Sequence, residues 1–408
     1  MLKTKQPDVI ISGAGVAGLS LALLLSNAGL KITLIDPMQK PNAKALKLGA
    51  VNQDIGTRTI ALMNDTLDTL AQTGVLGEIT PHMEDMCALQ IIDAGDVKDK
   101  KITFTSAEID LPRFGANIPN AILSKALISK AAKDKNIIVL YDNEVDSFTS
   151  TQTNVTVHLK NKKTLTAALL VGADGRNSKV RTLCEIDTEV KDSAQRALTC
   201  ILDAEQFHSH TSTEFHYEGG PFTIVPLPEG KVSLVWVEKQ SRAEYWLAQD
   251  SADQEAEINA MAKGLLGHLS LISKIDSYPL ISLQAKRVTD TRIALIAEAA
   301  HVLHPMGAQG LNASLRDVAI LAEKIIAAAG CGIDFGGEIT LNQYAAQRQN
   351  DAAMRNKFSF SLNKMVANDS WSLKLLRRFG LGTLKQHSHL RHAIMRYGLA
   401  PYKHRAGK

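Results

Sequence analysis

The segment that decides the fold is Gly13-Ala-Gly-Val-Ala-Gly18, which stands between the apolar runs 9–11 and 19–25. This order predicts a strand, a tight turn and a helix. Gly13 permits the turn, Gly15 lets backbone N–H groups approach a pyrophosphate, and Gly18 lets the helix pack closely on the strand. The segment therefore predicts a site for a dinucleotide cofactor, lined by Gly13, Ala14, Gly15, Val16, Ala17 and Gly18.

Asp36 supports this interpretation. It ends a second apolar run, residues 32–35, about 20 residues beyond the glycines, where a carboxylate can accept hydrogen bonds from an adenosine ribose. The alternative is a glycine turn in an α/β protein that holds no ligand. The strand, the helix and the acid in register favour the cofactor site.

Length and composition describe a multidomain enzyme. The 408 residues exceed one ordinary core, which predicts two domains and an appendage. The hydrophobic content of 45% is that of a soluble globular enzyme, and no apolar run is long enough to span a bilayer. Without a signal-peptide pattern the expected location is cytoplasmic. The cysteines lack metal spacing and are expected to be reduced thiols, so no metal site is predicted: Cys87, Cys184, Cys200 and Cys331.

The basic residues concentrate near the C-terminus. The net charge is +4, yet residues 374–408 hold nine Lys or Arg and no Asp or Glu. Apolar residues between these charges recur at helical spacings, including Leu375, Leu376, Phe379 and Met395. This pattern is typical of a basic amphipathic helix that lies on an anionic membrane surface. A helix packed on its own domain with a solvated basic face is an equal alternative.

The order of expected elements gives a fold class. Strands and helices alternate around the glycine turn, a run of alternating strands follows residue 182, and helices dominate the end. We expect an α/β protein with a Rossmann-type, glutathione reductase-like nucleotide-binding domain, an inserted antiparallel β-sheet substrate domain and a C-terminal helical segment. A helix is expected to open at residues 58–62. The expected boundaries are 1–75, 112–181 and 286–332 for the first domain, 76–111 and 182–285 for the second, and 333–408 for the helical region.

Two further motifs follow in order. In Gly172-Ala-Asp-Gly-Arg-Asn-Ser-Lys-Val-Arg181 a buried strand runs into a turn, with Asp174 at the strand end and Gly175 permitting the turn. The third motif is Ala297-Glu-Ala-Ala-His-Val-Leu-His-Pro-Met-Gly-Ala-Gln-Gly-Leu-Asn312. Its histidines, His301 and His304, are expected to be satisfied by the turn rather than to act in catalysis.

The three ordered motifs resemble the flavoprotein aromatic hydroxylases, the group A flavin monooxygenases related to p-hydroxybenzoate hydroxylase. The resemblance covers nearly the whole chain and implies one FAD held at its two ends. The third motif departs from the usual pattern, because Ala297 and Glu298 replace Gly-Asp, and Gly307-Ala308 precedes Gln309. This variant, with the segment Ile118-Pro-Asn-Ala-Ile-Leu123 and the C-terminal segment 390–401, is similar to ubiquinone-biosynthesis hydroxylases.

The resemblance also implies roles for individual residues. Glu298 is expected to accept hydrogen bonds from ribityl hydroxyls, and backbone N–H groups near Gly310 to face the flavin pyrimidine ring. Arg58, Pro305 and Gln309 are the candidate catalytic residues. The other expected FAD contacts are Arg58, Asn120, Asp174, Gly175, Gly307, Ala308, Gln309, Leu311 and Asn312.

The implied reaction is hydroxylation of the ring of a polyprenylated phenol in ubiquinone biosynthesis, with NADPH or NADH and O₂, through a C4a-hydroperoxyflavin. Expected partners are that phenol, other ubiquinone-biosynthesis proteins and the inner face of the membrane as a peripheral surface, but no nucleic acid; a homodimer stays open. Two alternatives remain: a soluble hydroxylase of a small aromatic acid, and a non-catalytic flavin-binding scaffold of the ubiquinone-making assembly.

Overall fold

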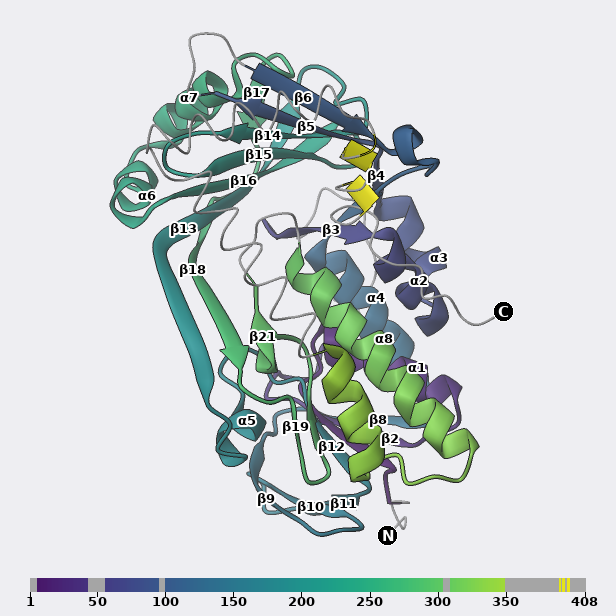
Figure 1. Cartoon of the computed structure of the whole chain (residues 1–408). Coiled ribbons are helices and arrows are strands. Elements are labelled where there is room, and N and C mark those ends of the chain that lie inside the picture. Colours follow the sequence, from purple (N-terminus) through teal and green to yellow (C-terminus); the bar gives the residue numbers. More distant parts are fainter. Residues whose placement is uncertain are drawn as a thin grey trace.

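The computed structural model describes residues 6–42, 56–94, 100–303 and 309–348, together with five residues between 389 and 396. The structure contains two large sheets. The long strands β13 (Thr188–Ala204) and β18 (Asp276–Ala285) belong to the second sheet and extend from it toward the first (Figure 1). Among the described residues, no helix combines the length and the apolarity needed to cross a membrane.

The first sheet is mainly parallel. Its order is β19-β20-β12-β1-β2-β8, and only β19 at the edge runs antiparallel to its neighbour. All residues of β1, β2 and β12 are buried, as expected for strands covered on both faces. The strands are β1 (Val9–Ser12), β2 (Ile32–Ile35), β8 (Ile137–Leu140), β12 (Leu169–Gly172), β19 (Thr289–Asp290) and β20 (Ile293–Leu295).

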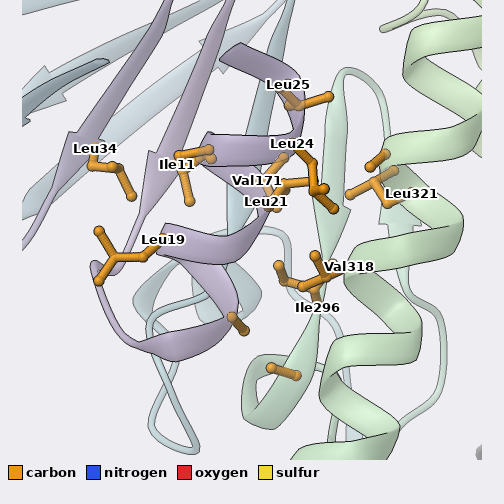
Figure 2. Packing of buried hydrophobic residues seen from close by; sticks show 14 of the residues in the cluster. Ile11, Leu19, Leu21, Leu24, Leu25, Leu34, Val171, Ile296, Val318 and Leu321 are labelled. Atoms are coloured by element: carbon orange, nitrogen blue, oxygen red, sulfur yellow. The ribbon is translucent and has the colours of Figure 1, made fainter. Parts of the chain in front are cut away.

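Helix α1 (Val16–Asn27) packs between two other helices against this sheet. It contacts α4 (Asn120–Ala132) and α8 (Gln309–Gly330). Leu21 and Leu24 of α1 belong to one buried cluster with Val318 and Leu321 of α8 (Figure 2). Because α1 is buried on nearly every side, its position is fixed by packing and its N-terminus is held at the sheet edge.

The second sheet has nine strands. Its order is β21-β18-β13-β16-β15-β14-β5-β6, and β17 (Leu269–Leu271) also pairs with β13. Helices α6 (Gln240–Leu247) and α7 (Ser251–Ala262) cover it over a core that contains Trp236 and Trp246. Its other strands are β5 (Ala88–Asp93), β6 (Lys100–Thr105), β14 (Thr211–His216), β15 (Pro221–Pro226), β16 (Lys231–Lys239) and β21 (His301–Val302).

This sheet is not purely antiparallel as the sequence predicts, because β14 and β5 run parallel. The two strands are separated by more than one hundred residues of chain, so no hairpin turn imposes an antiparallel direction on them. Local sequence indicates strands and the hairpins that join neighbouring strands. It does not determine the relative direction of two strands that are distant in the sequence.

A small third sheet corrects the helix expected at residues 58–62. Residues Thr59–Met63 form strand β3, which pairs with β7 (Gly115–Pro119), and β7 also pairs with β4 (Glu84–Met86). The helix α2 (Asn64–Thr73) therefore begins only after β3. The β-branched and apolar residues of 59–63 suit either structure, and the distant partner β7 decides in favour of a strand.

Shorter elements complete the described chain. They are α3 (Leu76–Ile79), η1 (Thr80–His82), η2 (Ser106–Ile109), α5 (Lys179–Leu183), η3 (Ala297–Ala299), a helical segment over 338–348, and the antiparallel strands β9 (Val145–Ser150), β10 (Val155–Leu159) and β11 (Thr164–Ala167).

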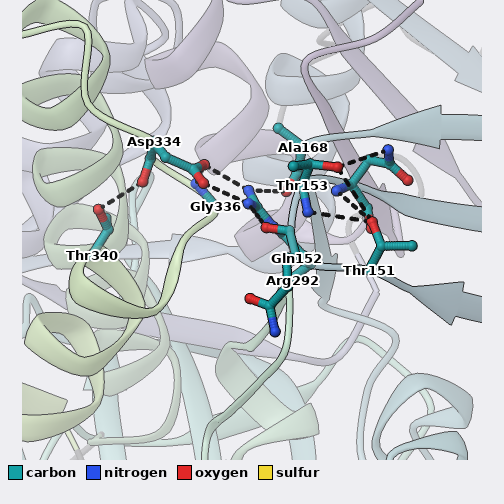
Figure 3. Close-up of polar contacts among 9 residues, drawn as sticks. Thr151, Gln152, Thr153, Ala168, Arg292, Asp334, Gly336 and Thr340 are labelled. Atoms are coloured by element: carbon teal, nitrogen blue, oxygen red, sulfur yellow. Dashed lines mark hydrogen bonds and ion pairs between the residues drawn. The ribbon is translucent and has the colours of Figure 1, made fainter.

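Arg292 ties three of these regions together. Its guanidinium donates to the carboxylate of Asp334, with Nη1 2.6 Å from Oδ1, and to the carbonyl of Gln152 in the β9–β10 turn (Figure 3). The hydrogen bond from Arg292 holds the pKa of Asp334 below its ordinary value. The end of α8 is thereby joined to the antiparallel strands beneath the first sheet.

The described part of the C-terminal region packs on the second sheet. Arg391 pairs with Glu108 through two hydrogen bonds of 2.5 and 2.7 Å, and its guanidinium lies over the ring of Phe104. Met395 is buried among Met63, Met86, Ile102, Phe104, Ile109 and Phe114. Met395 is thus part of a protein core rather than an exposed apolar face, which agrees with the packed alternative for this part of the basic segment.

Candidate functional site

The predicted glycine turn follows β1 directly. Gly13 has φ +105°, and a Cβ atom there would lie 2.3 Å from the carbonyl oxygen of Ala173. A Cβ atom on Gly18 would lie 2.0 Å from the carbonyl oxygen of Gly13, whereas one on Gly15 meets no atom of the described residues within 4 Å. Gly13 and Gly18 are therefore required by packing. The open space at Gly15 is a cradle that a side chain would fill.

This cradle lies at the N-terminus of α1. Gly15 is the N-cap residue, it is exposed, and no side chain caps the helix. The first N–H groups of a helix have no acceptor within it and carry the positive end of the helix dipole. Within the described part of the chain the exposed turn thus presents its N–H donors without a capping side chain, which fits the pyrophosphate of a dinucleotide.

Asp36 lies beside the same turn. Its Oδ2 accepts a hydrogen bond of 2.6 Å from the N–H of Ala14, and its Oδ1 accepts one of 2.8 Å from the N–H of Met38. A carboxylate oxygen can accept two hydrogen bonds. Asp36 therefore fixes the glycine turn and keeps acceptor capacity for a ribose hydroxyl.

The second motif forms a compact turn after β12. Asp174 accepts a hydrogen bond of 2.5 Å from the hydroxyl of Ser178 and one of 3.1 Å from the N–H of Val180. Gly175 has φ +79°, a left-handed conformation that favours glycine. Ser178 caps α5 by accepting from the N–H of Arg181.

Arg181 connects the second motif to the third. Its side chain donates to the carbonyl oxygen of Ala299 at 3.0 Å and to that of Arg176 at 2.8 Å. Burial lowers the pKa of Arg181, although the negative charge of Asp174 acts to raise it. Segments more than one hundred residues apart are therefore held together by one buried guanidinium.

The third motif begins with a strained residue. Ala297 stands where the usual pattern has glycine, and it has φ +56° in the left-handed region. Its N–H donates to Oδ2 of Asp317 at 2.8 Å. The next residue, Glu298, is exposed and makes no hydrogen bond or ion pair with another described residue. Its carboxylate is available to a ligand at the sheet edge.

Asp317 of α8 is a site residue that sequence reasoning missed. Its Oδ2 also lies 2.7 Å from Nε2 of His301, and its Oδ1 accepts a hydrogen bond of 2.6 Å from Nε of Arg348. Burial alone would raise the pKa of Asp317, but the charges of His301 and Arg348 outweigh it and hold the pKa below its ordinary value. Nε2 of His301 is thus paired with a residue of α8 rather than with the turn, and its buried Nδ1 has no hydrogen-bond partner among the described residues.

The end of the third motif starts α8. Asn312 is fully buried, and its side chain accepts from the N–H of Met63 and the hydroxyl of Thr66 and donates to the carbonyl of Ala61. These contacts fix α8 to β3 and α2. Gln309, Gly310 and Leu311 form the first turn of α8, and the predicted site residues Pro305, Gly307 and Ala308, like His304, lie outside the described residues.

Arg58 lies at the start of β3, away from the glycine turn in sequence. It is exposed, its guanidinium lies 5.1 Å from the ring centroid of Tyr278, and its carbonyl accepts from the N–H of Asn120. The structure therefore brings two predicted site residues, Arg58 and Asn120, into contact. The neighbouring Thr59 hydroxyl lies 2.9 Å from that of Ser233, so Arg58 stands where the small sheet meets the second sheet.

Four candidate residues share one edge of the parallel sheet. Gly13, Asp36, Asp174 and Glu298 each follow within three residues the carboxyl end of β1, β2, β12 and β20. These strands are neighbours and run parallel. Ligands of open α/β sheets bind outside this edge. Residues spread over almost 300 positions thus share one edge of the parallel sheet.

Comparison with known proteins agrees with this geometry. The family model described as FAD binding domain matches residues 6–357. Ubiquinone hydroxylase UbiL of Rhodospirillum rubrum is 30% identical over 98% of this chain and 91% of its own length, and 3-demethoxyubiquinol 3-hydroxylase of Escherichia coli is 24% identical over 97% and 99%. The crystal structure of p-nitrophenol 4-monooxygenase PnpA from Pseudomonas putida matches with a TM-score of 0.77 at 16% identity. The match covers 98% of this chain and 99% of the PnpA chain.

Proposed function

Because this chain belongs to the FAD-binding domain family and, within it, to the ubiquinone hydroxylases, we propose that it hydroxylates the aromatic ring of a polyprenylated phenol in ubiquinone biosynthesis. It is a flavoprotein monooxygenase with a mixed α/β fold. The observation that carries the substrate class is the 30% identity to UbiL over 98% of the chain.

The residues at the edge of the parallel sheet fit FAD. The open space at Gly15 and the uncapped N-terminus of α1 suit the pyrophosphate, and Asp36 suits the adenosine ribose. The exposed carboxylate of Glu298 has no hydrogen-bond or ion-pair partner among the described residues and suits the ribityl hydroxyls, and the N–H groups that open α8 at Gln309 suit the flavin ring. In this assignment the parallel sheet belongs to a Rossmann-type FAD-binding domain, and the nine-stranded sheet belongs to the substrate domain.

FAD, once bound and reduced by NADPH or NADH, supplies the chemistry that activates O₂. The chain has to bind the phenol, orient its ring and exclude water. The exposed guanidinium of Arg58 lies over Tyr278, where its charge would favour the phenolate form of a ring bound between β3 and the second sheet. The hydrogen bond between Thr59 and Ser233 holds these two surfaces together.

Quinone analysis in cells that lack this chain tests the proposal. In these cells we expect a prenylated phenol to accumulate that lacks one ring hydroxyl group needed for the quinone. Expression of the wild-type chain should restore the quinone. The purified protein is expected to hold about one FAD. A preparation that binds no FAD on reconstitution would indicate the scaffold alternative, and hydroxylation of a small aromatic acid with normal quinone levels would indicate the soluble-hydroxylase alternative.

We also propose that the basic residues between 374 and 408 place the enzyme at the inner face of the membrane, as its bilayer-soluble substrate would require. Arg391 is paired with Glu108, so it is excluded from this role. Flotation with anionic vesicles at low and high salt is the test: salt-sensitive binding supports the proposal, and its absence at low salt contradicts it.

A further inference from the structure

Two histidines and a glutamate meet where the small sheet approaches the second sheet. Glu84 belongs to β4, and His208 and His210 belong to the loop before β14. One ligand atom from each residue lies within 4.8 Å of the other two. Nδ1 of His210 is 2.6 Å from Oε1 of Glu84, and the Glu84 side chain is only 15% exposed. These three residues have no part in the proposed flavin site.

His208 is oriented as metal-binding histidines are. Its side chain is 3% exposed, and its Nε2 lies 3.0 Å from the carbonyl oxygen of Leu227. A carbonyl only accepts, so Nε2 carries the hydrogen and Nδ1 keeps the lone pair. Nδ1 accepts only a long hydrogen bond of 3.2 Å from the N–H of His210. Donation from the remote ring nitrogen to a carbonyl is the arrangement that orients histidine ligands in metal sites.

The loop backbone brings the two imidazoles together. Ser209 and His210 have φ +49° and +55°, two consecutive left-handed residues that are not glycine. The ring centroids of His208 and His210 are 6.0 Å apart, and the ring of Phe207 lies 4.5 Å from that of His208. Such a conformation costs free energy and persists where surrounding contacts enforce it.

Asn117 adds an independent observation on the same face. It stands directly opposite Glu84 in the β4–β7 pair, so the two side chains project to one side of the small sheet. Asn117 is fully buried, and neither its Oδ1 nor its Nδ2 has a hydrogen-bond partner among the described residues. A buried amide without a partner is costly, and a metal-bound water beside Glu84 would satisfy it.

We propose that Glu84, His208 and His210 bind one divalent transition-metal ion of the zinc class. Two imidazole nitrogens and one carboxylate oxygen suit Zn²⁺ and its neighbours, whereas Mg²⁺ and Ca²⁺ prefer oxygen ligands throughout. In a tetrahedral zinc site with bonds of about 2.0–2.2 Å, the ligand atoms lie roughly 3.3 Å apart. The 2.6 Å contact must therefore open slightly. His210 is 45% exposed and has room to rotate.

The ion would join two sheets. β4 pairs with β7, which pairs with β3, the strand that follows Arg58. The histidine loop leads into β14 of the nine-stranded sheet. A metal bond between them would fix the small sheet against the second sheet. The proposed effect is on how the two sheets are held together, and it stands independently of the proposed reaction.

Zinc titration of the full-length, EDTA-treated protein tests the site. We expect one Zn²⁺ per chain by calorimetry, a higher Tm with Zn²⁺, and visible absorption bands of tetrahedral Co²⁺ after cobalt substitution. Glu84→Gln and His210→Asn should each weaken Zn²⁺ binding by more than about 10-fold. His210 is half-exposed, so His210→Asn is expected to fold, which circular dichroism checks.

His268→Asn is the matched control. His268 faces Glu255 at 3.2 Å in an exposed pair that has no third ligand among the described residues, so this variant should bind Zn²⁺ like the wild type. Absence of saturable binding to the wild type overturns the proposal. Binding that is unchanged in His210→Asn also overturns it, because the ion would then occupy another place, such as the histidines near the C-terminus.

Discussion

Nε2 of His301 lies 2.7 Å from Oδ2 of Asp317, and the same oxygen accepts the N–H of Ala297 at 2.8 Å. One side chain of α8 therefore holds both ends of the segment that carries Glu298. Arg348, which belongs to the segment that follows α8, donates a hydrogen bond to the other carboxylate oxygen of Asp317. The position of Glu298 is set by this buried carboxylate rather than by contacts of its own.

Asp317→Asn keeps the side-chain volume but removes the charge that Arg348 and His301 face in a buried place. We expect a loss of about 3 kcal/mol in the free energy of unfolding, because a buried cation loses its partner. Urea unfolding measures it. The control is Asp187→Asn, since Asp187 and its partner Lys286 are both exposed. Equal losses in the two variants would contradict this prediction.

Gly15→Val and Gly18→Ala should separate cofactor binding from folding. A Cβ atom at Gly15 meets no atom of the described residues within 4 Å, so Gly15→Val should fold with a nearly unchanged Tm of the FAD-free protein and fail to retain FAD. Gly18→Ala places Cβ 2.0 Å from a backbone oxygen and should lower the Tm of the FAD-free protein strongly. Thermal melting and flavin absorbance report the two effects. Retention of FAD by Gly15→Val would exclude the pyrophosphate from this turn.

Glu298→Ala should weaken FAD affinity without loss of stability. Hydrogen bonds from ribityl hydroxyls to a carboxylate contribute about 1–3 kcal/mol, which corresponds to roughly 5- to 150-fold in Kd. The exposed carboxylate makes no hydrogen bond or ion pair with another described residue, so the FAD-free protein should unfold at the same urea concentration. Glu298→Asp should restore only part of the affinity, because Asp is shorter. Unchanged affinity in Glu298→Ala would show that Glu298 is not the family's ribityl-binding acid.

Glu108 predicts a pH dependence of stability. The hydrogen bond from Arg391 is the main cause that lowers the pKa of Glu108 from 4.5 to about 2. Because the pKa is lowered in the folded state, the stabilisation is complete above pH 4.5 and is lost as the pH falls toward 2. Arg391→Gln should reduce stability at pH 6 and flatten its fall between these pH values, measured by urea unfolding.

Lys160→Gln is the matched control for Arg391→Gln. Lys160 and Glu144 form a comparable ion pair of 2.7 Å on the surface, where solvent screens it. This variant should leave stability and its pH dependence nearly unchanged. An identical acid-unfolding profile in wild type and Arg391→Gln would rule out Glu108 as the titrating group.

Local patterns predicted which residues share one edge of the parallel sheet. The glycines at 13–18, Asp36 and Asp174 each follow an apolar run, and parallel strands bring such positions to one edge wherever the strands lie in the sequence. Nothing local identified Asp317, a single acid within a helix, because its partners His301 and Arg348 come from other segments. An acid on the buried face of an amphipathic helix is the signal that could have found it.

Non-local pairing explains the remaining differences. Residues 59–63 became β3 through β7, and the cluster of Glu84, His208 and His210 forms only when β4 and the loop before β14 approach. More than 120 residues separate Glu84 from His208. Metal-ligand spacings within one short motif cannot reveal such a set.

The parallel pairing of β5 with β14 also sets an order of events during synthesis. β5 ends at Asp93, whereas β14 ends at His216, about 120 residues later. At roughly 5–20 residues per second, a ribosome needs on the order of 10 s to supply the partner strand. During that interval the β5–β6 hairpin emerges with an unpaired edge, the kind of surface that chaperones shield. Its core is completed later still, when Met395, about 180 residues beyond the end of β14, leaves the ribosome.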